Sequence, residues 1–522
     1  MVAFTGNTDQ TVRRLACSMK IDWQAFRRAR EARDVRFDGK FFVGAKNTRI
    51  YCRPSCPVPT IADKNVRYFP SAAAAAEAGF RPCLRCRPEC SPGTPAWQGT
   101  PSTVSRALRL IAESGLEDGG VETLAARLGV GSRHLRRLFL KHLGASPSAV
   151  AQTRRLHFAK KLIDETTLPM NQIALAAGFG CVRRFNATIY ATYRRTPTHI
   201  RRLAKLKEPQ SENEYIFRLR FRPPYDWEAM LSFLALRATP GVEMVEDGRY
   251  RRTISHNDEH GCFEISLDDE NPALVARVQF PNPRALFAIV ERIRRMFDLN
   301  ADWPAILECL STDSTLAGAV QANPGLRLPG CWNGFELAVR AILGQQISVK
   351  GATTLAGRIV RAYGTPFIAD GGLTFLFPTS KVLSQARLTN VGLTKARAET
   401  IRALAQAVTR GELCFEGIVD SDSFLEQLRE IPGIGEWTAQ YIAMRALGDP
   451  DALPSGDIGL LRRLKLANAR ELEARAEAWR PWRAYGAVYL WSMSNGSTRA
   501  AEVIRTKSSI PDRRRLLLAA GD

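Results

Sequence analysis

LREIPGIGEWTAQYIAMRALGDPDALPSGDIGLLRRL, residues 428–464, decides the fold of the carboxyl-terminal part of the chain. Two amphipathic segments flank the PGIG turn, and this pattern predicts a helix-hairpin-helix. Gly433 and Gly435 lack side chains, so their backbone amides can approach a DNA phosphate and bind it without reading base sequence. Asp457 follows a Pro-Ser-Gly break at the expected start of the next helix. Taken alone, an aspartate at such a position is usually a helix cap.

The sequence upstream of this hairpin changes its periodicity near residue 300. From Tyr215, the segments YIFRLRFRPP, CFEISLDD and ALVARVQF alternate apolar and polar residues, which predicts β-strands. A helical segment, DWEAMLSFLALRA, lies between them. From about Leu299 to Ala500 the periodicity is mostly helical. We therefore expect a small α+β unit followed by an all-helical one.

Three features of this half resemble DNA-3-methyladenine glycosylase II of the AlkA type. They are the hairpin, the aspartate 22 residues beyond Gly435, and GLRLPGCWNGFELAVRAILGQQISV at residues 325–349. The resemblance begins near Tyr215 and ends near Gly496. It implies that the enzyme flips a damaged nucleotide out of the duplex, and that Asp457 assists cleavage of the glycosidic bond. The implied substrates are alkylated purines of the 3-methyladenine and 7-methylguanine class.

The same resemblance assigns a pocket for the base. It implies Trp437, Tyr441 and Trp491 as aromatic walls that attract a cationic alkylated base, although aromatic content alone favours core packing for these rings. Trp437 stands where relatives that also cut the sugar-phosphate backbone have a lysine, so we expect a monofunctional glycosylase. Gln346 stands where the AlkA type inserts an apolar wedge into the duplex, and it is the candidate for that DNA contact.

Four cysteines near the amino terminus have the spacing of metal ligands. Cys52 and Cys56 form a C-x3-C pair, Cys83 and Cys86 form a C-x2-C pair, and 26 residues separate the two pairs. Four thiolates arranged in this way can reach one tetrahedral ion, so Zn²⁺ is the expected cofactor. The spacing alone favours a structural zinc site over a reactive one.

The residues around these cysteines resemble the amino-terminal domain of Ada adaptive-response proteins over about residues 20–90. The strings that carry the resemblance are GKFFVGAKNTRIYCRPSC, residues 39–56, and GFRPCLRC, residues 79–86. It implies that Cys52 accepts a methyl group from a methyl phosphotriester in DNA, as a zinc-bound thiolate. The loss of that negative charge would then strengthen DNA binding. Arg49 departs from the family, which often has glycine there.

The segments between these two parts predict two basic helix-turn-helix units. VETLAARLGVGSRHLRRLFLKHLGASP (121–147) and MNQIALAAGFGCVRRFNATIYATYRRTP (170–197) have Gly129 and Gly178 in equivalent turns 49 residues apart. The pair resembles the DNA-binding domain of AraC-type transcription regulators over residues 106–203. The candidates for base or phosphate contacts are Ser132, Arg133, Arg136, Arg137, Val182, Arg183, Arg184 and Asn186. The residues expected in the core are Leu135, Phe139, Phe179 and Phe185.

The positive charge of the chain is concentrated in its amino-terminal part. The formal net charge is +22, and residues 1–205 hold 35 Lys and Arg against 14 Asp and Glu, a balance of +21. Such an excess favours a polyanionic partner, double-stranded DNA, over a merely solvated basic face. The first twenty residues lack the apolar core of a signal peptide, and no apolar run is long enough to span a bilayer. We therefore expect a cytoplasmic protein without a membrane partner.

Together these patterns predict a multidomain fold. It combines a small α+β zinc domain, an all-α tandem helix-turn-helix domain, an α+β TBP-like domain and an all-α helix-hairpin-helix glycosylase domain. The expected ranges are 1–92, 93–205, 206–300 and 301–505, followed by a tail at 506–522. The resemblances imply one chain that excises alkylated purines, accepts methyl groups and activates transcription. We expect a monomer that binds alkylated and operator DNA, with RNA polymerase as a candidate partner.

Two alternatives stay open at this point. The glycosylase half could merely hold damaged DNA, which would leave a transcription regulator without turnover. The zinc domain could recognise DNA without accepting a methyl group. None of the eleven cysteines has the Pro-Cys-His-Arg context of the second methyltransferase domain of Ada proteins, so repair of O6-methylguanine is not expected.

Overall fold

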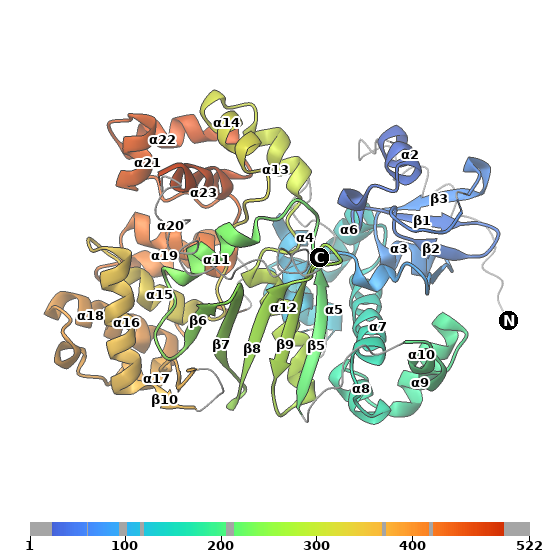
Figure 1. Ribbon diagram of the computed structural model, residues 1–522, viewed down its shortest axis with the longest axis horizontal. Helices are drawn as coiled ribbons and strands as arrows, with labels where there is room; N and C mark the ends of the chain where they lie inside the picture. Colours follow the sequence, from blue (N-terminus) through green and yellow to red (C-terminus); the bar gives the residue numbers. More distant parts are fainter. Residues whose placement is uncertain are drawn as a thin grey trace, which may run out of the picture.

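A computed structural model gives the architecture of the chain (Figure 1). It describes residues 23–59, 61–92, 102–114, 120–204, 213–367, 372–416 and 421–494. The tail predicted at 506–522 and residues 93–101, the start of the second predicted domain, lie outside the described residues. Within these ranges no helix is long and apolar enough to cross a membrane.

A four-stranded sheet with two short helices builds the cysteine-containing domain. Its elements are α2 (Trp23–Glu31), β1 (Phe42–Ala45), β2 (Ile50–Cys52), β3 (Val66–Phe69), α3 (Ala72–Glu77) and β4 (Arg81–Pro82). The strand order is β3-β1-β2-β4, with β2 parallel to β4 and the other pairs antiparallel. The parallel register pairs Tyr51 with Pro82, so Cys52 and Cys83, the next residues, lie at the same end of these two strands.

A block of helices follows, and it contains the two predicted helix-turn-helix units. Its elements are α4 (Ser102–Ser114), α5 (Gly120–Arg127), α6 (Ser132–Leu143), α7 (Pro147–Glu165), α8 (Met170–Ala176), α9 (Val182–Tyr193) and α10 (Pro197–Leu203). The units are α5 with α6 and α8 with α9, and the long helix α7 connects them. The turn residues Gly129 and Gly178 have φ of +66° and +74°, which glycine adopts without strain. Leu135, Phe139, Phe179 and Phe185 are buried, as expected for core residues.

The predicted α+β unit is a five-stranded antiparallel sheet with two helices. Its elements are β5 (Glu214–Arg220), α11 (Trp227–Ala235), β6 (Glu243–Glu246), β7 (Arg249–His256), β8 (Glu259–Leu267), β9 (Ala273–Gln279) and α12 (Leu286–Met296). The strand order is β5-β9-β8-β7-β6, so β5 and β6 are the edges. In β5, Tyr215, Phe217 and Leu219 are buried on one face, as the alternation predicts, whereas on the other face Ile216 is buried too and Arg218 and Arg220 are partly exposed.

Helices dominate the carboxyl-terminal part, as the periodicity predicts. They are α13 (Trp303–Leu310), α14 (Ser314–Ala322), α15 (Gly334–Leu343), α16 (Val349–Tyr363), α17 (Ser380–Leu383), α18 (Lys395–Thr409), α19 (Ser421–Glu430), α20 (Glu436–Ile442), α21 (Ile458–Leu464), α22 (Ala469–Ala476) and α23 (Arg483–Ser494). A two-stranded ribbon, β10 (Thr365–Pro366) with β11 (Phe375–Leu376), lies between α16 and α17. Their apolar faces share one large buried core.

The parts of the chain pack directly against each other. One buried core joins residues of α7 to α10 with the five-stranded sheet, and Phe158 of α7 lies edge-on to Phe287 of α12 at 4.9 Å between centroids. The fully buried Arg222 donates from Nε to the carbonyl oxygen of Asp38 and from Nη1 to that of Asn300, at 3.1 and 2.9 Å. The zinc domain is therefore held against the junction between the sheet and the carboxyl-terminal helices.

Candidate functional sites

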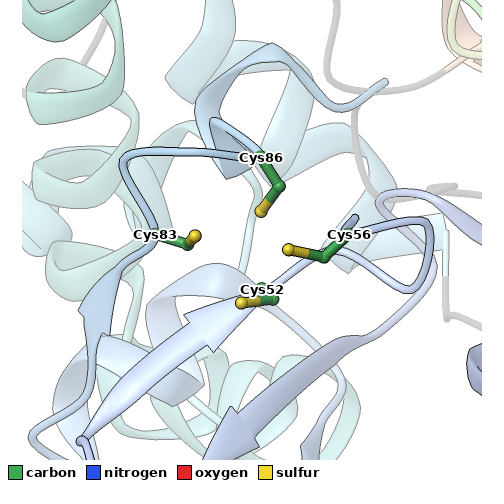
Figure 2. A group of neighbouring side chains, drawn as sticks. All are labelled: Cys52, Cys56, Cys83 and Cys86. Carbon is green, nitrogen blue, oxygen red and sulfur yellow. The ribbon is translucent and has the colours of Figure 1, made fainter. Parts of the chain in front are cut away.

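Four buried cysteine side chains form the first candidate site (Figure 2). Cys52 ends β2, Cys56 lies in the turn after it, and Cys83 and Cys86 lie in the turn after β4. Their Sγ atoms all lie within 4.8 Å of one another. Zn–S distances near 2.3 Å place tetrahedral sulfurs roughly 3.8 Å apart, so the four residues fit zinc. The ligands predicted from the spacing come together, and the predicted cofactor is Zn²⁺.

The two cysteine turns are fixed by backbone hydrogen bonds. The Cys56 amide donates to the carbonyl oxygen of Arg53 at 3.1 Å, and the Cys83 amide donates to that of Tyr51 at 3.0 Å. Contact with Cys56 is the largest cause that raises the pKa of Cys52, whereas contact with Cys52 is the largest cause that lowers the pKa of Cys83. The shifts have opposite signs because neighbouring thiols share protons. A divalent cation would replace those protons and hold all the sulfurs as thiolates.

The second candidate site is centred on Asp457, at the start of α21. Its Oδ1 accepts from the amide of Leu460 at 3.0 Å, which caps the helix, and from Nε1 of Trp491 at 3.1 Å. Its Oδ2 accepts from Nε1 of Trp437 at 3.0 Å. Three donors thus fix the orientation of a half-buried carboxylate. The Asp457 side chain therefore caps α21, as expected from the sequence, and also lies among the aromatic rings of the candidate pocket.

The three predicted pocket aromatics gather around this carboxylate. Trp437 and Tyr441 lie one turn apart on α20 and stack with centroids 5.4 Å apart and planes 9° apart. Trp491 of α23 lies 6.3 Å from Tyr441 at an angle of 58°. All three side chains are half-buried. They are therefore not fully enclosed core residues, which is what aromatic content alone would favour.

Two arginines beside Tyr441 were not predicted from the sequence. Arg445 donates from Nη1 to the Tyr441 hydroxyl at 2.7 Å and from Nη2 to the carbonyl oxygen of Gly330 at 3.0 Å. Burial alone would raise the pKa of Tyr441, but the charges of Arg445 and Arg237 lower it below its ordinary value. Arg445 follows Tyr441 by four residues, so helical spacing could have indicated this contact. Arg237 lies in the turn after α11, and no local pattern links it to the pocket.

The predicted hairpin joins α19 to α20. Gly433 has a φ of +89°, and a Cβ there would lie 2.2 Å from Oγ1 of Thr400. Gly435 is the N-cap of α20, and a Cβ there would meet nothing within 4 Å. The second glycine therefore leaves the amino-terminal amides of α20 open to an approaching phosphate.

A neighbour of the predicted wedge residue supports this hairpin. Gln345 donates from Nε2 to the carbonyl oxygen of Gly433 at 2.9 Å and to Oγ1 of Thr438 at 3.0 Å. Gln346 is exposed with a φ of +56°, and the Ile347 side chain beside it is 38% exposed. Gln346 thus faces solvent, whereas Gln345, which the sequence analysis did not select, is hydrogen-bonded to the hairpin.

The two recognition helices, α6 and α9, present matching surfaces. Of the eight predicted contact residues, Ser132 is half-buried and the others are exposed: Arg133, Arg136, Arg137, Val182, Arg183, Arg184 and Asn186. Arg136 forms an exposed ion pair with Glu122 at 2.7 Å, and Arg137 contacts Nδ1 of His134 at 3.0 Å. Each helix packs its apolar side against the helix before it, α5 or α8, so its basic side faces solvent.

Four family models match successive parts of the chain. They are the metal binding domain of Ada over residues 25–89, a helix-turn-helix domain over 124–203, the AlkA N-terminal domain over 216–333, and the HhH-GPD superfamily of base excision DNA repair proteins over 339–484. Their order along the chain agrees with the order of domains predicted from the sequence.

Known proteins match both the whole chain and its parts. A protein of Mycobacterium tuberculosis, described as a probable bifunctional transcriptional activator/DNA repair enzyme AlkA, is 41% identical over 484 residues, which cover 91% of this chain and 97% of that protein. DNA-3-methyladenine glycosylase 2 of Escherichia coli is 33% identical over 53% of this chain and 96% of its own length. The bifunctional transcriptional activator/DNA repair enzyme Ada of Escherichia coli is 36% identical over 24% of this chain and 34% of its own length.

Proposed function

Because this chain belongs to the family of bifunctional transcriptional activators and DNA repair enzymes of the AlkA kind, we propose a role in one repair response for the residues of both sites. The chain is a DNA glycosylase for alkylated purines, joined to a zinc methyl acceptor and a helix-turn-helix activator, and its partner is DNA. The observation that carries the residue assignment is the Asp457 carboxylate, held by the indoles of Trp437 and Trp491 beside an aromatic pocket.

Asp457 is the catalytic carboxylate of base excision. When the glycosidic C–N bond breaks, its electron pair leaves with the base, and positive charge develops on the sugar. A fixed carboxylate stabilises that charge more strongly in the transition state than in the ground state. A water molecule then adds to the sugar cation and releases its proton to the solvent. The two indole donors hold the carboxylate in place, so little reorganisation is needed as the charge appears.

Trp437, Tyr441 and Trp491 select the flipped base. An alkylated purine is often cationic, and stacking between electron-rich rings favours a cation over a normal base. Gly433 and Gly435 would hold a phosphate of the same strand through backbone amides. Gln346 would contact the duplex at the place that the flipped nucleotide has left. Trp437 stands where a backbone-cutting enzyme would need a lysine, so we propose a monofunctional glycosylase.

Cys52 is the methyl acceptor, and it binds zinc with Cys56, Cys83 and Cys86. Zinc, when bound, keeps the sulfurs deprotonated at neutral pH. The Cys52 sulfur attacks the methyl carbon of a methyl phosphotriester, a C–S bond forms, and the C–O bond breaks. The electron pair of that bond stays with the phosphate oxygen, which leaves a normal phosphodiester. The protein ends with one thioether and one negative charge fewer.

The exposed residues of α6 and α9 would bind operator DNA: Arg133, Arg136, Arg137, Arg183, Arg184 and Asn186. An activator that binds upstream of a promoter acts on RNA polymerase, and we propose this enzyme as its protein partner. The chain presents each of its sites within one protomer, so we propose a monomer. Its substrate and operator are both chromosomal DNA, which supports a cytoplasmic location.

The test of Asp457 is release of 3-methyladenine and 7-methylguanine from methylated duplex DNA in single turnover. Asp457→Asn keeps the shape of the cap, so DNA binding should remain while release falls by about 100-fold or more. Asp313 is a matched control, because it also caps a helix and accepts from an indole, that of Trp479 at 3.0 Å, outside the pocket. Asp313→Asn should lower stability and leave the rate of release unchanged.

Two other outcomes would change the assignment. Release from Asp457→Asn at the wild-type rate would exclude this carboxylate from the reaction. Tight binding of methylated DNA without release from either protein would favour a regulator that only holds damaged DNA. Mass spectrometry of the Cys52 peptide after incubation with methylated DNA tests the other site, and an unmodified peptide would reject the transfer.

A further inference from the structure

A small basic pocket lies where the zinc domain, α7 and β5 meet. Figure 1 shows β5 at the edge of the sheet nearest to the zinc domain. It encloses about 100 Å³ and touches the zinc ligand Cys86. Its charged lining consists of Arg53, Arg85, Arg87, Glu165, Arg218 and Arg220. Five guanidinium groups against one carboxylate favour an anion, and the volume suits a single phosphate-sized group.

Two of the five arginines differ from the others in having no direct ion pair among the described residues, although the charge of Asp38 acts on Arg220 from a distance. Arg53, Arg87 and Arg218 are each paired with an acidic side chain at 2.8 to 3.2 Å. The guanidinium groups of Arg85 and Arg220 form no ion pair or hydrogen bond within the part of the chain that the structure describes. Arg85 is exposed, whereas Arg220 is half-buried. Burial and the charge of Arg53 lower the pKa of Arg220, and an anion in the pocket would offset both effects.

The position of Arg220 follows from the alternation of β5. Tyr215, Phe217 and Leu219 face the buried core, so Arg218 and Arg220 stand on the opposite face of the strand. This strand belongs to the glycosylase half of the chain. The zinc domain contributes the other three arginines of the pocket, and the basic cluster exists only because the two halves are packed together.

We propose that this arginine pocket binds a phosphodiester of DNA close to the methylated phosphate, so that β5 of the glycosylase half completes the DNA site of the methyl acceptor. The inference rests on the proposed role of Cys52. Arg53 directly follows Cys52, and Cys86 of the same cysteine cluster lines the pocket. A DNA strand whose triester reaches the cluster therefore brings neighbouring phosphates past Arg85 and Arg220. These neighbouring phosphates are not methylated, so they keep their negative charge. The arginines would offset the repulsion between these phosphates and the nearby thiolates.

The test is the rate of methyl transfer by the zinc-loaded full-length protein. The substrate is a duplex with one methyl phosphotriester, and the readout is S-methylated Cys52 peptide by mass spectrometry. Arg220→Ala should lower the second-order rate constant about tenfold and reduce the slope of log rate against log salt by about one. Arg220→Lys should recover part of the rate, because it restores the charge without the fork of donors. Arg85→Ala, at an exposed residue, should have a similar effect without a risk to folding.

Arg249→Ala is the matched control for loss of one positive charge. Arg249 lies on β7 of the same sheet, pairs with Glu264 at 2.8 Å and is exposed. Its rate and salt slope should equal those of the wild type. Zinc content and melting temperature, measured for every variant, identify any loss of rate that comes from a damaged zinc domain.

A second arm identifies the source of the anion. The substrates are duplexes in which one phosphate flanking the triester is replaced by a neutral methylphosphonate. At one or two of these positions the replacement should slow methyl transfer by the wild type about tenfold. At the same positions it should not slow methyl transfer by Arg220→Ala any further. Equal sensitivity of both proteins at every position would overturn the proposal. If inorganic phosphate slows the wild type alone while neutral flanking positions have no effect, the pocket binds free anion and the assignment to DNA is wrong. A wild type that never methylates Cys52 would instead reject the proposed acceptor.

Discussion

The hydroxyl of Tyr51 lies 2.9 Å from Nε2 of His157, a contact between residues 106 positions apart in the chain. Tyr51 directly precedes Cys52, and His157 lies in α7, the helix that connects the two helix-turn-helix units. The strand that carries the proposed methyl acceptor is therefore hydrogen-bonded to the helix that connects the two DNA-binding units. A change in the shape or charge of the zinc site would act on α7 through this hydrogen bond.

The first prediction concerns the pH dependence of this interface. Burial lowers the pKa of His157 from its ordinary 6.5 to about 4. Between these values the unfolded chain binds a proton that the folded chain does not, so stability is lost as the pH falls from 6.5 towards 4. The full shift corresponds to about 3 kcal/mol, and contact of the ring with a solvent-accessible cavity reduces this to about 2 kcal/mol. Urea unfolding at pH 7.5 and pH 5.0 measures the change.

His157→Gln is the comparison for this experiment. It removes the titrating group and keeps a side chain that can bond to the Tyr51 hydroxyl. Acid also weakens the cysteine cluster, but this effect is common to both proteins and cancels in the difference. The variant should lose less stability between the two pH values. Equal losses would show that His157 does not titrate in this range.

The second prediction concerns the indole donors of Asp457. Trp437→Phe and Trp491→Phe keep an aromatic wall and remove one N–H donor each. Each should slow single-turnover release of 3-methyladenine about tenfold, because the carboxylate loses part of its fixed orientation. In the Asp457→Asn background the same changes should have little further effect. Fully additive losses would instead assign the tryptophans to stacking alone.

The sequence predicted the groups that local spacing determines, and missed those that depend on distant segments. The cysteine pairs, the turn glycines at 129 and 178, and Asp457 as a cap all follow from short-range patterns, and the structure contains each of them. The contact of Arg222 with Asp38 spans 184 positions, and nothing in either segment alone indicates the other. Arg220 is a similar case, since only the packing of two domains brings it to the zinc site.

The third prediction separates the two glycines of the hairpin. Gly433→Ala should destabilise the carboxyl-terminal helices by about 2 kcal/mol or more, since φ is +89° and the new methyl would collide with Thr400. Gly435→Ala meets nothing within 4 Å, so the fold should be preserved. Its methyl would stand where a phosphate approaches, and DNA affinity should fall about tenfold. Thermal melting and fluorescence anisotropy measure the two effects. Unchanged affinity in Gly435→Ala would place the phosphate elsewhere.

The fourth prediction concerns removal of zinc. Metal binding and folding are coupled in such clusters, so a chelator should unfold the cysteine-containing domain and abolish methylation of Cys52. Base release should persist, because the pocket around Asp457 is built from other elements. Cys56→Ser should behave like the chelated protein. Parallel loss of zinc, methyl transfer and base release would show that the glycosylase half needs the zinc domain to fold.

The last prediction compares Gln345 with Gln346, adjacent residues with different environments. Gln345→Ala removes a donor to the Gly433 carbonyl oxygen and to Thr438, so it should lower stability by about 1 to 2 kcal/mol and weaken DNA binding through the hairpin. Gln346 is exposed and makes no such contact with the hairpin. Gln346→Ala should leave melting unchanged and slow base release from duplex DNA about tenfold, because the gap left by the flipped nucleotide is no longer filled. Release from a lesion opposite an abasic site, which is already unpaired, should change far less. If Gln346→Ala slows both substrates equally, the residue acts on binding in general, and the exposed Ile347 becomes the candidate for the wedge.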